Sequence, residues 1–193
     1  MEHEKKFDPK KLAKLNDPAR LEYMPPDYIW RAMGYGGKGD VIDIGAGTGF
    51  FALQFNRISP GVKIYACDLS DVMVDWMKGN LPLEVRDTIV PMMMAESSVP
   101  LGDSIAGLVY MINLHHELEE PAKLIREARR LLMPGGLLAI IDWKKAETPS
   151  GPPMEIRVEE SLIEAQMTEG GFTNIKKHAG FAYHNFLVGQ RVD

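Results

Sequence analysis

Apolar residues along this chain gather in short runs that alternate with stretches of helical periodicity. Short continuous apolar runs are typical of strands buried on both faces of a parallel sheet. They lie at 41–44, 64–67, 89–94, 107–112 and 137–141. Between them, apolar side chains recur three or four residues apart, which predicts helices. These segments are 71–77, 120–133 and 158–167. The alternation of the two patterns predicts an α/β fold.

The two ends of the chain differ from this middle part. Two last strands are expected near 175–178 and 185–188, after a helix that ends at Gly170-Gly171. The first residues are polar and rich in proline, with one short helix at Asp27–Met33 ended by a glycine. We therefore expect an N-terminal helical lead-in at 1–37, packed on the edge of the sheet, and a single domain at 38–193.

Three alternating glycines, Gly45, Gly47 and Gly49, follow the first apolar run and precede a helical pattern. Glycines at such a place let the backbone reverse and approach a ligand closely. A dinucleotide-binding fingerprint needs its third glycine one residue later, where this chain has Phe50. The pattern therefore predicts a strand, a tight turn and a helix at a ligand site, with a glycine spacing that differs from the dinucleotide fingerprint. A turn that serves only to enter the helix is the alternative.

An acidic residue, Asp68, closes the second strand about 20 residues beyond the last glycine. In a βαβ nucleotide site, a carboxylate at this position accepts hydrogen bonds from ribose hydroxyls. Asp68 could equally cap the helix that follows. The glycine turn upstream favours the ribose role.

The glycine turn, together with Asp43 two residues before it, resembles motif I of the class I S-adenosylmethionine-dependent methyltransferases. The resemblance implies a Rossmann-like doubly wound sheet of about seven strands, mostly parallel with an antiparallel C-terminal edge hairpin. It implies S-adenosyl-L-methionine as cofactor, with Asp43 near the cofactor's amino group. N-terminal segments fold over the cofactor as a lid in several members of that family, so a lid formed by the segment around Phe7 is the alternative to packing on the sheet edge. The cofactor-binding residues expected on this basis are Asp43, Gly45, Ala46, Gly47, Gly49, Asp68, Leu69, Ala95, Glu96 and Asn113.

Smaller motifs narrow the resemblance. The tripeptide Leu114–His116 resembles the ubiquinone/menaquinone C-methyltransferase branch, and 141–145 with 151–153 resembles a small uncharacterised subgroup. The chain departs from the family pattern at Met94, where an aspartate is usual, so that Glu96 becomes the substitute for contact with the adenine. It departs again before the fourth strand, where alanine and glycine replace the usual phenylalanine and aspartate.

Candidate catalytic and substrate residues follow the fourth and fifth strands, because ligands of open parallel sheets bind at the carboxyl ends of the strands. One of His115 and His116 is expected to act as a base on the acceptor, and the other to pack structurally. A metal site is disfavoured, since neighbouring residues on a strand point to opposite faces. The expected substrate contacts are Asp142, Trp143 and Lys144.

Composition limits the partners. The net charge of −5 over 193 residues argues against nucleic acids and anionic membranes, which require basic surfaces. The single cysteine, Cys67, excludes an internal disulfide and disfavours arsenite as acceptor. No apolar run approaches the length of a membrane span, so we expect a cytoplasmic protein.

The predicted function is methyl transfer to a small molecule by in-line displacement. The alternatives are a non-catalytic cofactor-binding module that works with a partner protein and, disfavoured by the glycine spacing, a nicotinamide oxidoreductase.

Overall fold

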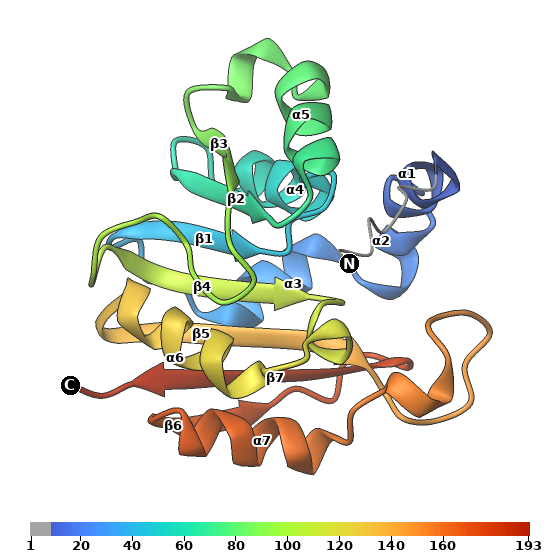
Figure 1. Cartoon of the computed structure of the whole chain (residues 1–193), viewed down its shortest axis with the longest axis vertical. Coiled ribbons are helices and arrows are strands. Elements are labelled where there is room, and N and C mark those ends of the chain that lie inside the picture. The colour runs from blue at the N-terminus through green and yellow to red at the C-terminus, as the bar shows by residue number, and fades with distance from the viewer. Residues whose placement is uncertain (1–8) are drawn as a thin grey trace, which may run out of the picture.

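The computed structural model describes residues 9–193 and places one seven-stranded sheet at the centre of the molecule (Figure 1). The strand order is β3-β2-β1-β4-β5-β7-β6. All pairs from β3 to β5 are parallel, whereas β7 is antiparallel to both of its neighbours. The strands are β1 (Asp40–Ile44), β2 (Ile64–Asp68), β3 (Ile89–Met93), β4 (Ala106–Ile112), β5 (Leu132–Trp143), β6 (Phe172–Lys177) and β7 (His184–Arg191). The predicted fold class is confirmed.

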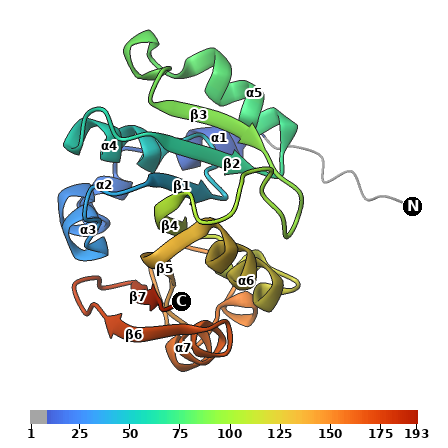
Figure 2. The ribbon, with the colours of Figure 1, turned by 90° about the vertical axis from the view of Figure 1, so that its left-hand side faces the viewer.

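Helices cover both faces of this sheet (Figure 2). One face carries α3 (Pro26–Met33), α4 (Phe50–Ile58) and α5 (Asp71–Asn80), and the other carries α6 (Pro121–Leu131) and α7 (Glu160–Glu169). Two short helices, α1 (Pro9–Leu15) and α2 (Arg20–Tyr23), precede α3. No helix among these described residues is long and apolar enough to cross a membrane.

Apolar side chains that alternate along each central strand fill the two cores. In β1, Val41 lies in the core under α3, α4 and α5, whereas Ile42 and Ile44 lie in the core under α6 and α7. Asp43 interrupts this pattern with a polar side chain that is only 4% exposed. Because side chains alternate between faces along a strand, Asp43 points to the same side as Val41.

Most element bounds agree with the sequence to within a few residues, with two local differences. Strand β5 begins at Leu132 rather than at Leu137, and the Pro-Gly-Gly segment lies within it, at an irregularity in its pairing with β4. The residues His115–Glu117 form a 3₁₀ turn and not the end of a strand. Asn113, directly after β4 and two residues before this turn, adopts a left-handed conformation with φ of 58°.

The lead-in helix α3 covers one face of the sheet. The prediction that it packs on the edge of the sheet is therefore wrong. Ile29 and Met33 are fully buried in the core, and Trp30 lies against Phe55 of α4 with ring centroids 5.3 Å apart. Tyr28 meets the ring of Phe186 on β7 edge-on. The apolar face of α3 therefore contributes to the main core. Phe7, the centre of the predicted lid, lies outside the described residues.

Candidate active site

The glycine turn between β1 and α4 is held open by three left-handed residues, with φ of 75° at Gly45, 56° at Gly47 and 72° at Gly49. Side chains rarely adopt this conformation, which explains the choice of glycine. The backbone N–H groups of Gly45 and Ala46 both donate to the carbonyl of Cys67 at 2.9 Å. The turn is therefore fixed to the end of β2, the strand that carries Asp68.

Asp68 joins the end of β2 to the glycine turn and to α5. Its Oδ2 accepts a hydrogen bond from the N–H of Gly47 at 2.7 Å, and its Oδ1 accepts from the N–H of Ser70 at 2.9 Å. The alternative role as cap of the following helix is wrong, because Ser70 is the N-cap and accepts from the N–H of Met73. Burial raises the pKa of Asp68, and the backbone hydrogen bonds oppose this.

Asp43 is a buried carboxyl group under the glycine turn. The hydroxyl of Tyr110 on β4 donates to its Oδ2 at 3.0 Å, because the β1–β4 register sets these two residues side by side. Burial raises the pKa of Asp43 to about 8, with the hydrogen bond from Tyr110 acting in the opposite direction. Asp43 is therefore mostly protonated at neutral pH. A cationic group beside it would favour the ionised form.

The surroundings of the turn fit the cofactor that the family resemblance implies. The hydroxyl of Thr48 is buried and has no hydrogen-bond partner among the described residues, so it is available to a ligand. The buried Asp43 suits an ammonium group, and the free acceptor capacity of the Asp68 carboxylate suits a pair of hydroxyls. The glycines let a ligand approach the backbone of the turn without obstruction by a Cβ.

The N-terminal helices lie over this turn. A Cβ placed on Gly47 would lie 3.5 Å from a methyl group of Leu15 in α1. In α2, the guanidinium of Arg20 lies 5.0 Å from the ring centroid of Phe50 and 4.9 Å from that of Phe51. Burial lowers the pKa of Arg20. The described part of the lead-in therefore borders the glycine turn.

The other predicted cofactor residues follow β2, β3 and β4, which are neighbours or near neighbours in the sheet. Leu69 is 58% exposed directly after β2. Ala95 and Glu96 are exposed in a turn after β3, where Ala95 bridges to Ser98. Asn113 is half-buried at the left-handed position after β4. The parallel topology thus brings these residues to the carboxyl ends of the strands, where the glycine turn also lies.

His116 and Asp142 form a pair that links the turn after β4 to the end of β5. The Nδ1 of His116 lies 2.7 Å from Oδ1 of Asp142, and the backbone N–H of His116 donates to Oδ2 of the same carboxylate at 2.9 Å. Both side chains are buried, with 6% of His116 and 1% of Asp142 exposed. A carboxylate bound to Nδ1–H fixes the ring and leaves Nε2 as the basic atom.

His115 has a different environment. Its Nε2 lies 2.7 Å from Oε1 of Gln166 in α7, and the residue is 2% exposed. Burial lowers the pKa of His115, so that it stays neutral and connects the turn to α7. The two histidines project differently from a 3₁₀ turn, so the strand-based argument against a metal does not apply here. Among residues 9–193, no group of three metal-binding side chains is found.

The predicted substrate residues Trp143 and Lys144 lie against the start of β7. The ring centroid of Trp143 is 4.2 Å from that of His184, which stacks on Tyr23 of α2. Lys144 donates from Nζ to the carbonyl of Phe181 at 2.7 Å. Burial lowers the pKa of His184 to about 4. Aromatic groups from three separate segments thus form one cluster at the end of β5.

Three polar residues of this site escaped the sequence analysis. Tyr110 lies inside an apolar run and is recognisable only once the register of β1 and β4 is known. Gln166 lies on a helix far along the chain from its partner His115. Thr48 could have been found, because its place between two glycines of the turn is visible in the sequence.

The comparisons with known proteins agree with this geometry. Residues 42–140, about half of the chain, match the family described as "Methyltransferase domain". The crystal structure of a SAM dependent methyltransferase from Aquifex aeolicus is 30% identical, with a TM-score of 0.89, and the match covers 97% of this chain and 100% of that one.

Curated relatives match shorter shares of both sequences. An uncharacterized methyltransferase of Mycobacterium tuberculosis is 28% identical over 78% of this chain, which spans 60% of the length of that relative. The 2-methoxy-6-polyprenyl-1,4-benzoquinol methylase of Caenorhabditis elegans is 28% identical over 58% of this chain and 40% of its own length. The family match, the Aquifex structure and the glycine turn lead to the same conclusion: this chain belongs to the S-adenosylmethionine-dependent methyltransferase family.

Proposed function

We propose that the chain transfers a methyl group from S-adenosylmethionine to a small-molecule acceptor. The observation that carries the proposal is the hydrogen bond between Gly47 and Asp68, which joins the glycine turn to the carboxylate at the end of β2. When bound, the cofactor supplies a methyl group already activated by a positively charged sulfur. The protein then has to hold the acceptor in line with this group, and such positioning can supply roughly 7–11 kcal/mol.

Two carboxyl groups and the glycine turn would hold the cofactor. Asp68 would accept hydrogen bonds from the ribose hydroxyls, and Asp43 would bind the amino group of the methionine part. Thr48 has a buried hydroxyl free for the same ligand. Glu96, after β3, would contact the adenine, and Asn113, after β4, would contact the methionine part. Each role rests on the placement of the residue at the carboxyl ends of β1 to β4.

His116 would act as the base when the acceptor loses a proton. The carboxylate of Asp142 holds Nδ1 of the ring, which leaves Nε2 to accept the proton. Asp142 would also stabilise the imidazolium that results. His115, held by Gln166, would keep the turn in place. General bases of this kind contribute about 10²–10⁴-fold to the rate.

The acceptor would be a planar or aromatic compound with a hydroxyl or an acidic carbon. Trp143 follows Asp142 at the end of β5 and forms an aromatic wall with His184 and Tyr23. Such a wall favours flat apolar molecules, which bury area and stack on rings. The quinol methylase among the relatives acts on a compound of this type by its name, which supports a quinol-like acceptor here.

Titration calorimetry tests the cofactor, and a methyl-transfer assay tests the acceptor. We expect S-adenosylmethionine and S-adenosylhomocysteine to bind at micromolar strength and NAD not to bind. Methyl transfer to quinols, phenols, thiols, amines and transfer RNA should then be compared. Transfer to RNA alone would contradict the small-molecule proposal. Cofactor binding without transfer to any acceptor would favour the non-catalytic module.

Cofactor affinity is expected to rise with pH. Because the Asp43 carboxyl has a pKa of about 8, it must release its proton to pair with the cationic amino group, so binding at pH 6 to 7 releases a proton. Linkage then predicts up to about tenfold tighter binding at pH 7 than at pH 6. Calorimetry in two buffers of different ionisation enthalpy measures the released proton directly. Asp43→Asn should bind more weakly and with no such pH dependence.

A further inference from the structure

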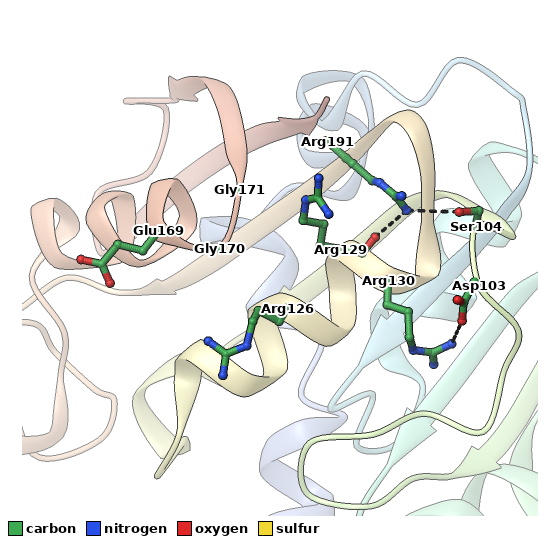
Figure 3. Close-up of a pocket in the computed structure, with 9 residues that line it drawn as sticks. All are labelled: Asp103, Ser104, Arg126, Arg129, Arg130, Glu169, Gly170, Gly171 and Arg191. Carbon is green, nitrogen blue, oxygen red and sulfur yellow. Dashed lines mark hydrogen bonds and ion pairs between the residues drawn. The ribbon is translucent and has the colours of Figure 1, made fainter. Parts of the chain in front are cut away.

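A pocket of about 450 Å³ lies at the opposite ends of the strands from the glycine turn. It is formed by the second half of α6, the end of α7 with the Gly170-Gly171 turn that follows it, the end of β7 and the loop before β4 (Figure 3). These segments meet at the amino ends of the parallel strands, whereas the glycine turn follows a carboxyl end. The two places are separated by the length of a strand, about 17–20 Å. Four arginines and two carboxylates line this pocket.

Two of the four arginines have clear structural partners. Arg130 pairs with Glu127 at 2.7 Å and with Asp103 at 2.5 Å, so its charge is balanced. Arg191 donates from Nη1 to the carbonyls of Arg129 and Leu132 at the end of α6. A guanidinium at this place satisfies carbonyls that the helix leaves free. These contacts explain the position of both side chains but use only part of the donors of Arg191.

Several strong donors remain without a partner. The Nε atoms of Arg129 and Arg191 are both buried and make no hydrogen bond with the described residues. Arg129 uses Nη2 to bind the main-chain oxygens of Val192 and Asp193. Arg126 lies on the same face of α6, three residues earlier, and has no hydrogen bond or ion pair within residues 9–193. Buried donors without acceptors are costly, so their presence calls for an explanation.

The charges of this pocket favour an anion. Arg126 and Arg191 contribute two positive charges that no carboxylate pairs with among the described residues, and Arg129 contributes a third, of which Nη2 binds the main-chain oxygen of Asp193. The remaining acid of the lining, Glu169, points away from the arginines (Figure 3). A guanidinium presents parallel N–H groups in a fixed fork, which matches the oxygens of a phosphate group.

We propose that this pocket binds the phosphate group of a small molecule, held by Arg126, Arg129 and Arg191. A phosphate group offers more acceptor oxygens and more charge than one carboxylate, as three guanidinium groups require. A nucleic acid is disfavoured, because it needs a long row of basic contacts and this chain has a net charge of −5. The site is independent of the proposed methyl transfer, since it lies at the amino ends of the parallel strands and the cofactor site lies at their carboxyl ends.

Calorimetry with inorganic phosphate, pyrophosphate and glycerol phosphate at low ionic strength tests the proposal. We expect submillimolar binding of at least one of these probes and none of chloride. Preference for glycerol phosphate identifies a phosphate monoester as the ligand, and preference for inorganic phosphate identifies the free ion. Arg126→Gln and Arg129→Lys should each weaken binding at least tenfold, because the first removes a charge and the second removes the Nε donor.

Arg57→Gln, an exposed arginine on α4, is the matched control and should bind phosphate as the natural chain does. Thermal unfolding shows whether each variant is folded, and S-adenosylhomocysteine binding should be unchanged in all of them. The proposal is overturned if phosphate binds no better than chloride. It is also overturned if folded variants keep full affinity, or if an RNA oligonucleotide binds there in preference to every small phosphate.

Discussion

Replacing Asp68 by alanine is expected to weaken the binding of S-adenosylmethionine and S-adenosylhomocysteine at least about 100-fold. Hydrogen bonds to a charged group contribute roughly 1.5–3 kcal/mol each, and the ribose would lose two of them. The substitution also removes the acceptor of the Gly47 N–H group, so the glycine turn loses its connection to Asp68. Titration calorimetry of both ligands measures the effect.

Asp75→Asn is the matched control for this experiment. Asp75 lies on α5, and its carboxylate is 76% exposed and pairs with Lys78. Removal of this charge should change the affinity less than twofold, because exposed pairs contribute little. If Asp68→Ala is folded and binds both ligands as tightly as the natural chain, Asp68 has no part in the cofactor site.

His116→Asn is expected to lower kcat about 10²–10⁴-fold for an acceptor that loses a proton, with little change in cofactor affinity. The asparagine lacks the basic Nε2 atom that would accept the proton. Asp142→Asn should lower kcat in the same way, because the ring of His116 loses the carboxylate that orients it. Initial rates at saturating cofactor give kcat, and S-adenosylhomocysteine titration gives the affinity.

His115→Gln separates the two histidines. His115 is bound to Gln166 and is almost completely buried. Its replacement should lower the melting temperature, since a buried hydrogen bond is lost, and should affect kcat much less than His116→Asn does. A larger loss of kcat in His115→Gln than in His116→Asn would show that His115, and not His116, is the base.

The sequence predicts most of the fold for a physical reason. Parallel strands buried on both faces must be apolar throughout, and glycines mark the points where the chain reverses. The same pattern gives the positions of Asp43, two residues before the glycine turn, and of Asp68, at the end of the second apolar run. The edge position of β3 was also predictable, because Pro91 cannot donate to a second neighbour.

Contacts between distant segments could not be predicted in the same way. The bond between Tyr110 and Asp43 depends on the β1–β4 register, and the His116–Asp142 pair depends on the neighbouring positions of β4 and β5. No local pattern encodes either. The 3₁₀ turn at His115 follows a left-handed Asn113, which an apolar strand pattern does not reveal. The place of α3 on a sheet face depends on packing against Phe55 and Phe186.

The strand order divides the site into two halves. Asp43 and Asp68, proposed to hold the methyl donor, come from β1 and β2, whereas His116, Asp142 and Trp143, proposed to act on the acceptor, come from the ends of β4 and β5. The boundary between the halves is the β1–β4 pair, which Tyr110 and Asp43 bridge. Substitutions on one side can therefore change the acceptor while the donor half stays constant. In such an architecture, new substrates can evolve without loss of the cofactor.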